Sequence, residues 1–220
     1  MITAALFAVH QRGHFWDDAK TKYHRERMGF LDPLAFENIY EKESFRPGAH
    51  PAKFLHGKEV MFIPFINRIR MDNSVGTGNW TEKYGGSNHW GLAVVVNVPC
   101  ADKAWIYLFD SGKGKGFALD EKICKKAVKE VLKKTNAFGH EKTSRVENAE
   151  FIHVDYAWLQ EDGVSCGIFA LSFMLQVTKV YNSIIAKHQE DESKAVTLSN
   201  RDLFIGFQDV KNEMNIKVQC

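Results

Sequence analysis

Four short apolar runs predict the strands of a small sheet. They span residues 59–65, 92–98, 104–109 and 150–154. Runs of this length, rich in β-branched and aromatic residues, are typical of buried strands. A turn around Pro99 and Asp102 separates the second run from the third and predicts an antiparallel pair. Pro64 is expected to stop the first strand, because proline cannot donate a ladder hydrogen bond.

Four other segments have the spacing or the start signals of helices. They span residues 33–42, 119–134, 166–181 and 199–214. Asp32-Pro33 is a helix-start signal, and Ser199 is a suitable N-cap for the last segment. Residues 166–181 are almost continuously apolar, which predicts a helix buried at the centre of the fold. The pattern therefore predicts an α+β fold, with a small mixed or antiparallel sheet packed around a buried central helix.

The length of 220 residues predicts a single domain over residues 1–220. Residues 67–88 are rich in Gly, Asn and Ser, which indicates a long surface loop inserted between two strands. Residues 1–50 are mixed in character and are expected to form an N-terminal extension that helps to bind substrate. The apolar start at residues 1–9 lacks the basic region of a signal peptide, and no stretch approaches the ~20 apolar residues of a membrane span.

Composition and charge exclude several classes of protein. Hydrophobic residues make up 45% and charged residues 25% of the chain, as in ordinary globular proteins. A net charge of +2 is too balanced to indicate a nucleic-acid partner. The four scattered cysteines suit a reducing compartment, so we expect an intracellular protein, cytoplasmic or nuclear. No metal-ligand spacing occurs among them, and we expect no metal or cofactor, no membrane contact and a monomer.

Three polar segments each place a reactive residue at the end of a predicted element. His89 precedes the strand at 92–98, Asp110 ends the strand at 104–109, and Cys166 begins the apolar helix. Two neighbouring antiparallel strands can bring His89 and Asp110 to the same edge of a sheet. A helix that starts at Cys166 can point its thiol at that edge, so the three residues predict a catalytic site.

These residue types suit a thiol nucleophile. A free cysteine has a pKa of about 8.5, and a helix N-terminus beside an imidazolium favours its thiolate. His89 would activate Cys166 and protonate the leaving amine, while Asp110 orients the histidine ring. Gln160 would donate its side-chain amide to the oxyanion beside the Cys166 backbone N–H. Gly167 would keep the approach to the thiol open.

At these positions the chain resembles the Ulp/SENP-type cysteine peptidases, whose clan also holds the adenovirus-type processing proteases. The motifs that carry the resemblance are His89-Trp90, Asp110-Ser111, and Gln160 with Cys166-Gly167. Their chain order, His then Asp then Cys, also matches, and the resemblance covers about residues 59–181. It implies a Ulp/adenain-like fold in which the central helix carries the nucleophile.

The resemblance also implies a substrate class. Such enzymes cut after the C-terminal Gly-Gly of SUMO, NEDD8 or ubiquitin, as isopeptidases or endopeptidases. Trp90 would then cover a narrow tunnel for Gly-Gly, and Gly163 matches the family pattern. The chain departs from that pattern at Ser165, where most members have Asp, and in the length of residues 67–88. The choice of modifier therefore stays open.

Other functions remain as alternatives. A YopJ-like acetyltransferase uses a related site, but the His89-Trp90 pair and Asp110 argue against it. A viral-type enzyme that processes polyproteins would cut short Gly-containing peptides well and folded modifiers poorly. A catalytically dead protein would only bind a modifier. A host enzyme and a bacterial effector secreted into a eukaryotic cell would have the same motifs, so the source also stays open.

Several motifs have simpler interpretations. Alone, Cys166 would be an inert buried thiol and Asp110 a turn residue. His10 and His14 have zinc-helix spacing but lack the intervening glutamate, which favours surface histidines. Residues 113–145 contain ten Lys or Arg and four Asp or Glu, a local charge of +6. A solvated helix face explains this charge; contact with an acidic partner is the alternative.

Overall fold

The described part of the chain forms one mixed α/β structure. The computed structural model describes residues 26–32, 35, 36, 39, 52–66, 89–97, 103–112, 121–139, 143–154, 161 and 165–189. Its strands are β1 (Met28–Phe30), β2 (Val60–Ile66), β3 (Trp90–Val96), β4 (Trp105–Phe109) and β5 (Glu150–Val154). Its helices are α3 (Ala52–Leu55), α5 (Glu121–Lys134), α6 (Thr143–Glu147) and α7 (Cys166–Gln189).

The five strands form one mixed sheet in the order β1-β2-β3-β4-β5. β3 is antiparallel to both β2 and β4, whereas the outer pairs β1–β2 and β4–β5 are parallel. The antiparallel pair predicted on either side of Pro99 is thus confirmed as β3 and β4. In its register, Leu92 lies opposite Phe109. This register places the start of β3 beside the end of β4.

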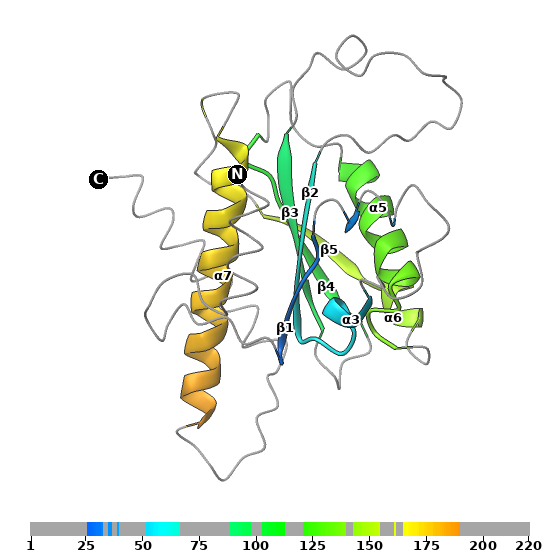
Figure 1. Ribbon diagram of the computed structural model, residues 1–220, viewed down its shortest axis with the longest axis vertical. Helices are drawn as coiled ribbons and strands as arrows, with labels where there is room; N and C mark the ends of the chain where they lie inside the picture. The colour runs from blue at the N-terminus through cyan, green and yellow to red at the C-terminus, as the bar shows by residue number, and fades with distance from the viewer. Residues whose placement is uncertain are drawn as a thin grey trace.

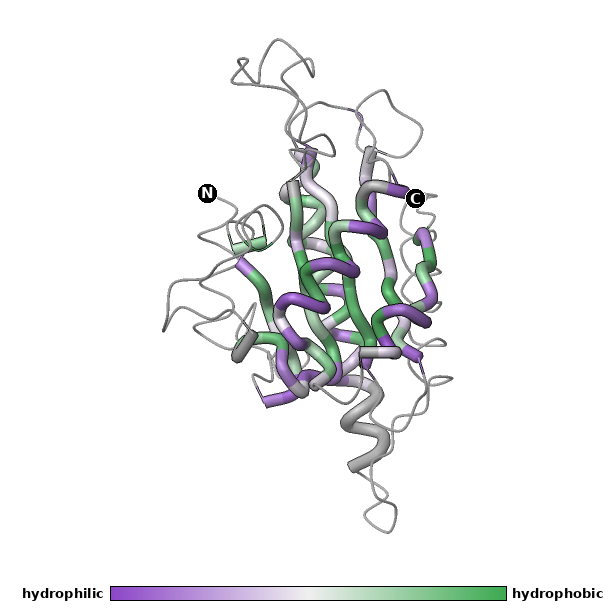
Figure 2. The backbone as a smooth tube through the Cα atoms, turned by 90° about the vertical axis from the view of Figure 1, so that its right-hand side faces the viewer, coloured by the Kyte–Doolittle hydropathy of each residue, from purple (hydrophilic) through white to green (hydrophobic). Residues whose placement is uncertain are grey.

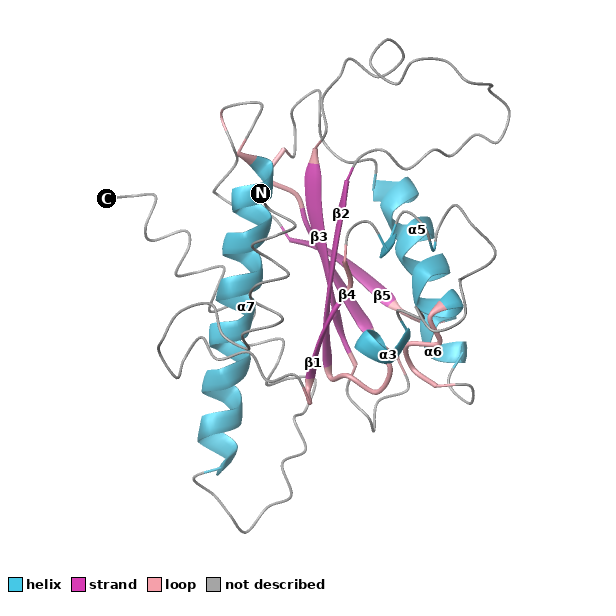
Figure 3. Cartoon of the chain, viewed as in Figure 1, coloured by secondary structure: helices cyan, strands magenta, loops and turns pink. Residues whose placement is uncertain are grey.

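Helices cover both faces of the sheet, as Figures 1 and 3 show. α7 lies on one face, and α3, α5 and α6 lie on the other. Side chains along a strand alternate between the faces, so β3 contributes Leu92 and Val94 to the α7 face and Ala93 and Val95 to the α5 face. Because both faces are covered, the strands are apolar at nearly every position rather than at alternate ones.

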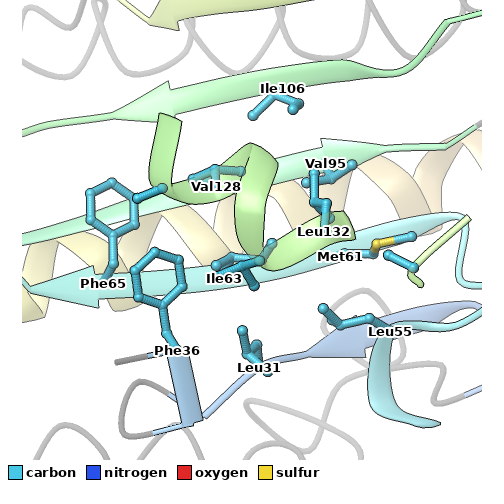
Figure 4. Packing of buried hydrophobic residues seen from close by; sticks show 14 of the residues in the cluster. Leu31, Phe36, Leu55, Met61, Ile63, Phe65, Val95, Ile106, Val128 and Leu132 are labelled. Atoms are coloured by element: carbon cyan, nitrogen blue, oxygen red, sulfur yellow. The ribbon is translucent and has the colours of Figure 1, made fainter. Parts of the chain in front are cut away.

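The core on the α5 face joins the sheet to the amphipathic helix α5. Val128 and Leu132 of α5 are fully buried and pack over Ile63 and Val95 of the sheet (Figure 4). Near them, the rings of Phe36 and Phe65 stack with their centroids 5.7 Å apart. Figure 2 looks onto this side and shows hydrophilic turns of α5 in front of largely hydrophobic strands. The lysine-rich sequence of α5 therefore forms its outer side.

The core on the α7 face is built from one stripe of the long helix. Its members recur every three or four residues, which is the spacing of one helix face: Cys166, Ala170, Phe173, Val177 and Tyr181. Phe173 packs against Phe109 of β4, with ring centroids 5.4 Å apart. Cys166 is the first residue of this stripe, so its side chain is directed to the end of the sheet.

The prediction that Pro64 stops the first strand was wrong. β2 continues through Pro64 to Ile66, and Pro64 pairs with Leu92 of β3. The Phe62 carbonyl accepts a hydrogen bond from Leu31 N–H, so Phe62 presents its backbone groups towards β1. Residues two apart in a strand direct their backbone groups to the same side, so Pro64 also faces the β1 side. β1 has already ended there, so the N–H that Pro64 lacks would have had no partner in β1.

Other predictions differ in extent. α7 continues to Gln189, beyond the predicted end at residue 181. It covers one face of the sheet, and Ile168 on its outer side is 62% exposed, so the helix is not enclosed on every side. The short elements β1, α3 and α6 were not predicted. Apolar composition alone does not reveal which side of a helix is covered, and three- to five-residue elements carry too little periodicity to be recognised.

Some predicted segments lie outside the described residues. These are most of the N-terminal extension at 1–50, the loop at 67–88 and the helix at 199–214. Of the helix predicted at 33–42, Ala35, Phe36 and Ile39 are described and are helical. Within the described ranges, no helix has the length and hydrophobicity needed to span a membrane.

Candidate active site

His89 and Asp110 lie at one end of the sheet. His89 directly precedes β3 and Asp110 directly follows β4. Because the two strands are antiparallel neighbours, the start of one meets the end of the other. His89 Nε2 and Asp110 Oδ1 are 2.5 Å apart, and the two residues are only 1% and 2% exposed. A buried, charge-assisted hydrogen bond of this kind fixes the plane of the imidazole ring.

Asp110 is itself held by the turn that follows β4. Its Oδ1 accepts the backbone N–H of Gly112 at 2.8 Å, as in an Asx turn. The same oxygen therefore meets two donors, one from the turn and one from His89. Asp110 is therefore both a turn residue and a hydrogen-bond partner of His89.

Cys166 lies at the first turn of α7. The Ser165 carbonyl accepts the N–H groups of Ile168 and Phe169, at 2.8 and 3.1 Å, which makes Ser165 the N-cap residue. Serine and aspartate are about equally favoured at this position, so the departure from the family pattern at Ser165 preserves the helix start. The Cys166 thiol is reduced and the residue is 3% exposed.

Cys166 lies close enough to His89 for the two side chains to shift each other's pKa. Burial lowers the pKa of His89, but hydrogen bonds and charge interactions with Asp110 and Cys166 outweigh burial and raise it from 6.5 to about 9. Since Nε2 of the ring is bonded to Asp110, Nδ1 is the ring nitrogen available to the thiol. His89 is therefore the middle member of a chain that runs from Asp110 to Cys166.

The pKa of the Cys166 thiol is shifted in the opposite direction, to a lower value. Burial raises the pKa of Cys166, but the hydrogen bond with His89 and those from the backbone N–H groups of Trp90 and Gly167 lower it overall. The lowered pKa of the thiol and the raised pKa of the histidine both favour the charged forms, a thiolate beside an imidazolium. Such a pair is nucleophilic at neutral pH without a separate base.

The sequence analysis missed the contribution of the Trp90 backbone to the lowered pKa of Cys166. Trp90 was predicted to act through its side chain, yet its N–H also donates to Cys166. Its position directly after His89, at the start of a strand, is the signal from which this contact could have been predicted. The side chain of Trp90 is half-buried and lies on the same sheet face as Leu92 and Val94, which is the α7 face.

The other predicted site residues are only partly covered by the structure. Gly167 is buried beside Cys166 and donates its N–H to the thiolate. Gln160 and Gly163 lie outside the described residues. Among the residues that are described, no group of three or more His, Cys, Asp or Glu side chains could hold a metal ion.

Comparisons with solved structures found matches of low similarity, among them two proteases. The ASFV pS273R protease is 14% identical over 80% of this chain, with a TM-score of 0.41; the chain spans 55% of the length of that protein. A de-sumoylating protease is 10% identical over 98% of this chain and 77% of its own, with a TM-score of 0.43. No protein-family model and no curated protein matches the chain.

Proposed function

We propose that the chain is a thiol peptidase that cleaves after the C-terminal Gly-Gly of a ubiquitin-like modifier. The observation that carries the proposal is the contact chain Asp110–His89–Cys166, in which the pKa of the histidine is raised and that of the thiol is lowered. These shifts favour the charged form of both groups at neutral pH. The motif order and the family resemblance supply the substrate class.

The first half of the reaction is acyl transfer to the enzyme. The Cys166 thiolate attacks the carbonyl carbon after the terminal glycine and forms a C–S bond, while the carbonyl oxygen becomes an oxyanion. The Cys166 N–H, at the start of α7, is a donor suited to that oxyanion, and we assign Gln160 as a second one. The C–N bond then breaks as protonated His89 gives its proton to the leaving amine, which leaves a thioester.

The second half of the reaction is hydrolysis of the thioester. His89, now neutral, removes a proton from water, and the oxygen attacks the thioester carbonyl. The C–S bond breaks and releases the Cys166 thiolate and the carboxylic acid of the modifier, which then loses its proton to solvent. Protonated His89 and the thiolate form the starting pair again, so no cofactor or external acid is consumed.

Burial of the nucleophile supports a glycine substrate. Cys166 is 3% exposed and its side chain faces the end of the sheet, so a bulky residue before the scissile bond would meet steric obstruction. Glycine has no side chain and fits a narrow approach. We assign the half-buried side chain of Trp90 as one wall of this approach and Gly163 as a further part of it. The preferred modifier, SUMO, ubiquitin or NEDD8, is for experiment to decide.

The test is covalent capture by modifiers that carry a C-terminal electrophile. Incubation of the protein with ubiquitin, SUMO and NEDD8 probes should give an adduct of the mass of one modifier, mapped to Cys166 by peptide mass spectrometry. Cys166→Ala should abolish the adduct. Cys124→Ala is the matched control, because Cys124 is also a buried thiol but lies in α5 on the other face of the sheet.

Two outcomes would contradict the proposal. An adduct that persists in Cys166→Ala would exclude Cys166 as the nucleophile. Rapid labelling of Cys166 by iodoacetamide, without an adduct from any of the three probes, would exclude the substrate class. Acetyl transfer and cleavage of short glycine-containing peptides would then be assayed on the same protein.

A further inference from the structure

The turn after β4 contains a contact that the reaction scheme does not use. Gly112 N–H donates to Asp110 Oδ1 at 2.8 Å, and that oxygen is also the one 2.5 Å from His89 Nε2. Asp110, Ser111 and Gly112 are all buried, so the turn is packed in place rather than moving in solvent. The turn and the histidine therefore share one acceptor atom.

A carboxylate held by one donor can still rotate about its terminal torsion, which has broad minima. A second donor on the same oxygen removes that freedom and fixes the direction in which Oδ1 points. The orientation of Oδ1 in turn decides the orientation of the His89 ring, because the ring donates Nε2–H to it. The direction of the opposite ring nitrogen, the buried Nδ1, is then fixed as well.

We propose that Gly112 is a positioning residue, whose backbone N–H acts through Asp110 Oδ1 to hold His89 in line with Cys166. This inference rests on the proposed function, since it concerns the same three side chains. Gly112 touches neither the substrate nor the reacting atoms. Its contribution is a backbone donor, so it depends on the N–H at position 112 and not on the size of the side chain there.

The test compares two substitutions at this position. Gly112→Pro removes the N–H, whereas Gly112→Ala is the conservative variant that keeps it. The measurement is the rate constant of Cys166 alkylation by iodoacetamide between pH 5.5 and 9.5, with Cys124→Ala as the background to remove the other described thiol. Iodoacetamide reports the thiolate directly and needs no modifier to bind.

Loss of the Gly112 donor should move the pH profile. In Gly112→Pro the acidic limb should shift towards that of an ordinary thiol, with at least a tenfold lower rate at pH 6.5, since one pKa unit corresponds to about a tenfold change in thiolate. Gly112→Ala should restore the acidic limb. In an Asp110→Ala background, adding Gly112→Pro should change the profile no further, because the donor acts only through Asp110.

Proline also constrains the backbone, so a second variant removes the donor without the ring. Replacing Gly112 by glycolate, introduced during translation in vitro, exchanges the N–H for an ester oxygen and keeps the chain otherwise unchanged. Its profile should match that of a folded Gly112→Pro protein. If Gly112→Pro does not fold, the glycolate variant alone decides.

A glycolate or folded proline variant with the parent profile would overturn the inference. So would an equal shift in the alanine variant, or a further shift in the Asp110→Ala background. These results are independent of the modifier probes. A shifted profile without any modifier adduct would support the role of Gly112 and reject the substrate, whereas an adduct with an unshifted profile would reject only the role of Gly112.

Discussion

The two ends of α7 bury ionisable side chains in opposite ways. At its start, the Cys166 thiol lies near His89, which is bonded to Asp110. Near its far end, Tyr181 is 1% exposed and its hydroxyl donates to Glu59 Oε2 at 2.5 Å. Burial opposes ionisation at both ends. The difference lies in the groups that face each side chain.

At the start of the helix the neighbours favour charge. His89 and the N–H groups of Trp90 and Gly167 all donate to Cys166, and their combined effect exceeds that of burial. At the far end, burial raises the pKa of Tyr181, and the hydrogen bond to the Glu59 carboxylate raises it further. Arg27, whose Nε is 3.9 Å from Glu59 Oε1, opposes this effect only in part. A buried group therefore becomes reactive when donors face it and inert when a carboxylate does.

The test of this comparison with the largest expected effect removes His89, the side chain that interacts with Cys166 at the start of α7. We expect His89→Ala to lower kcat/KM about 1,000-fold, because the general acid and base is lost and the thiol loses its partner. The measurement is steady-state hydrolysis of the modifier that forms an adduct. A decrease of less than tenfold would show that another group activates Cys166.

The pH dependence of Cys166 sharpens the comparison. Its pKa is lowered, so we expect the acidic limb of its alkylation profile to lie at lower pH than for an ordinary thiol of pKa about 8.5. His89 has a pKa raised to about 9, and it loses its proton as the pH rises through that value. Hydrolysis should therefore decline above pH 9, when the leaving amine can no longer be protonated, while alkylation continues.

The same protein unfolded in urea is the reference for the alkylation rate, since Cys166 then has no fixed neighbours. An acidic limb at the same pH for the folded and unfolded protein would contradict the lowered pKa. A parallel decline of alkylation and hydrolysis above pH 9 would indicate that the thiol itself, rather than His89, limits both.

The smallest effect is expected at the far end of α7. Tyr181→Phe removes the hydroxyl that bonds to Glu59 and should lower the free energy of unfolding by about 1 kcal/mol. The pH profile of Cys166 alkylation should not change, because the hydroxyl lies near the other end of the stripe that packs on the sheet. Urea unfolding measures the first effect. A shifted alkylation profile would show that the two ends are coupled.

Much of the fold could be predicted because it depends on local patterns. Apolar runs located β2, β3, β4 and β5, and β5 has the predicted bounds of Glu150–Val154. The prediction failed at Pro64, because whether a strand tolerates proline depends on where its neighbour ends. β1 has three residues, too few for a pattern, and its parallel pairing with β2 arises only when distant segments meet.

The candidate active site can also be divided into features that the sequence determined and features that only the tertiary structure decided. The sequence by itself determined which residue types are present and that His89, Asp110 and Cys166 stand at the ends of their elements. Only the tertiary structure decided that His89 bonds to Asp110, through the oxygen that also accepts the Gly112 N–H, and that Cys166 lies near His89 and Trp90. The physical reason is that a pKa depends on burial and on charges a few ångströms away. Some of those neighbours come from distant segments of the chain: His89 and Asp110 are 21 positions apart.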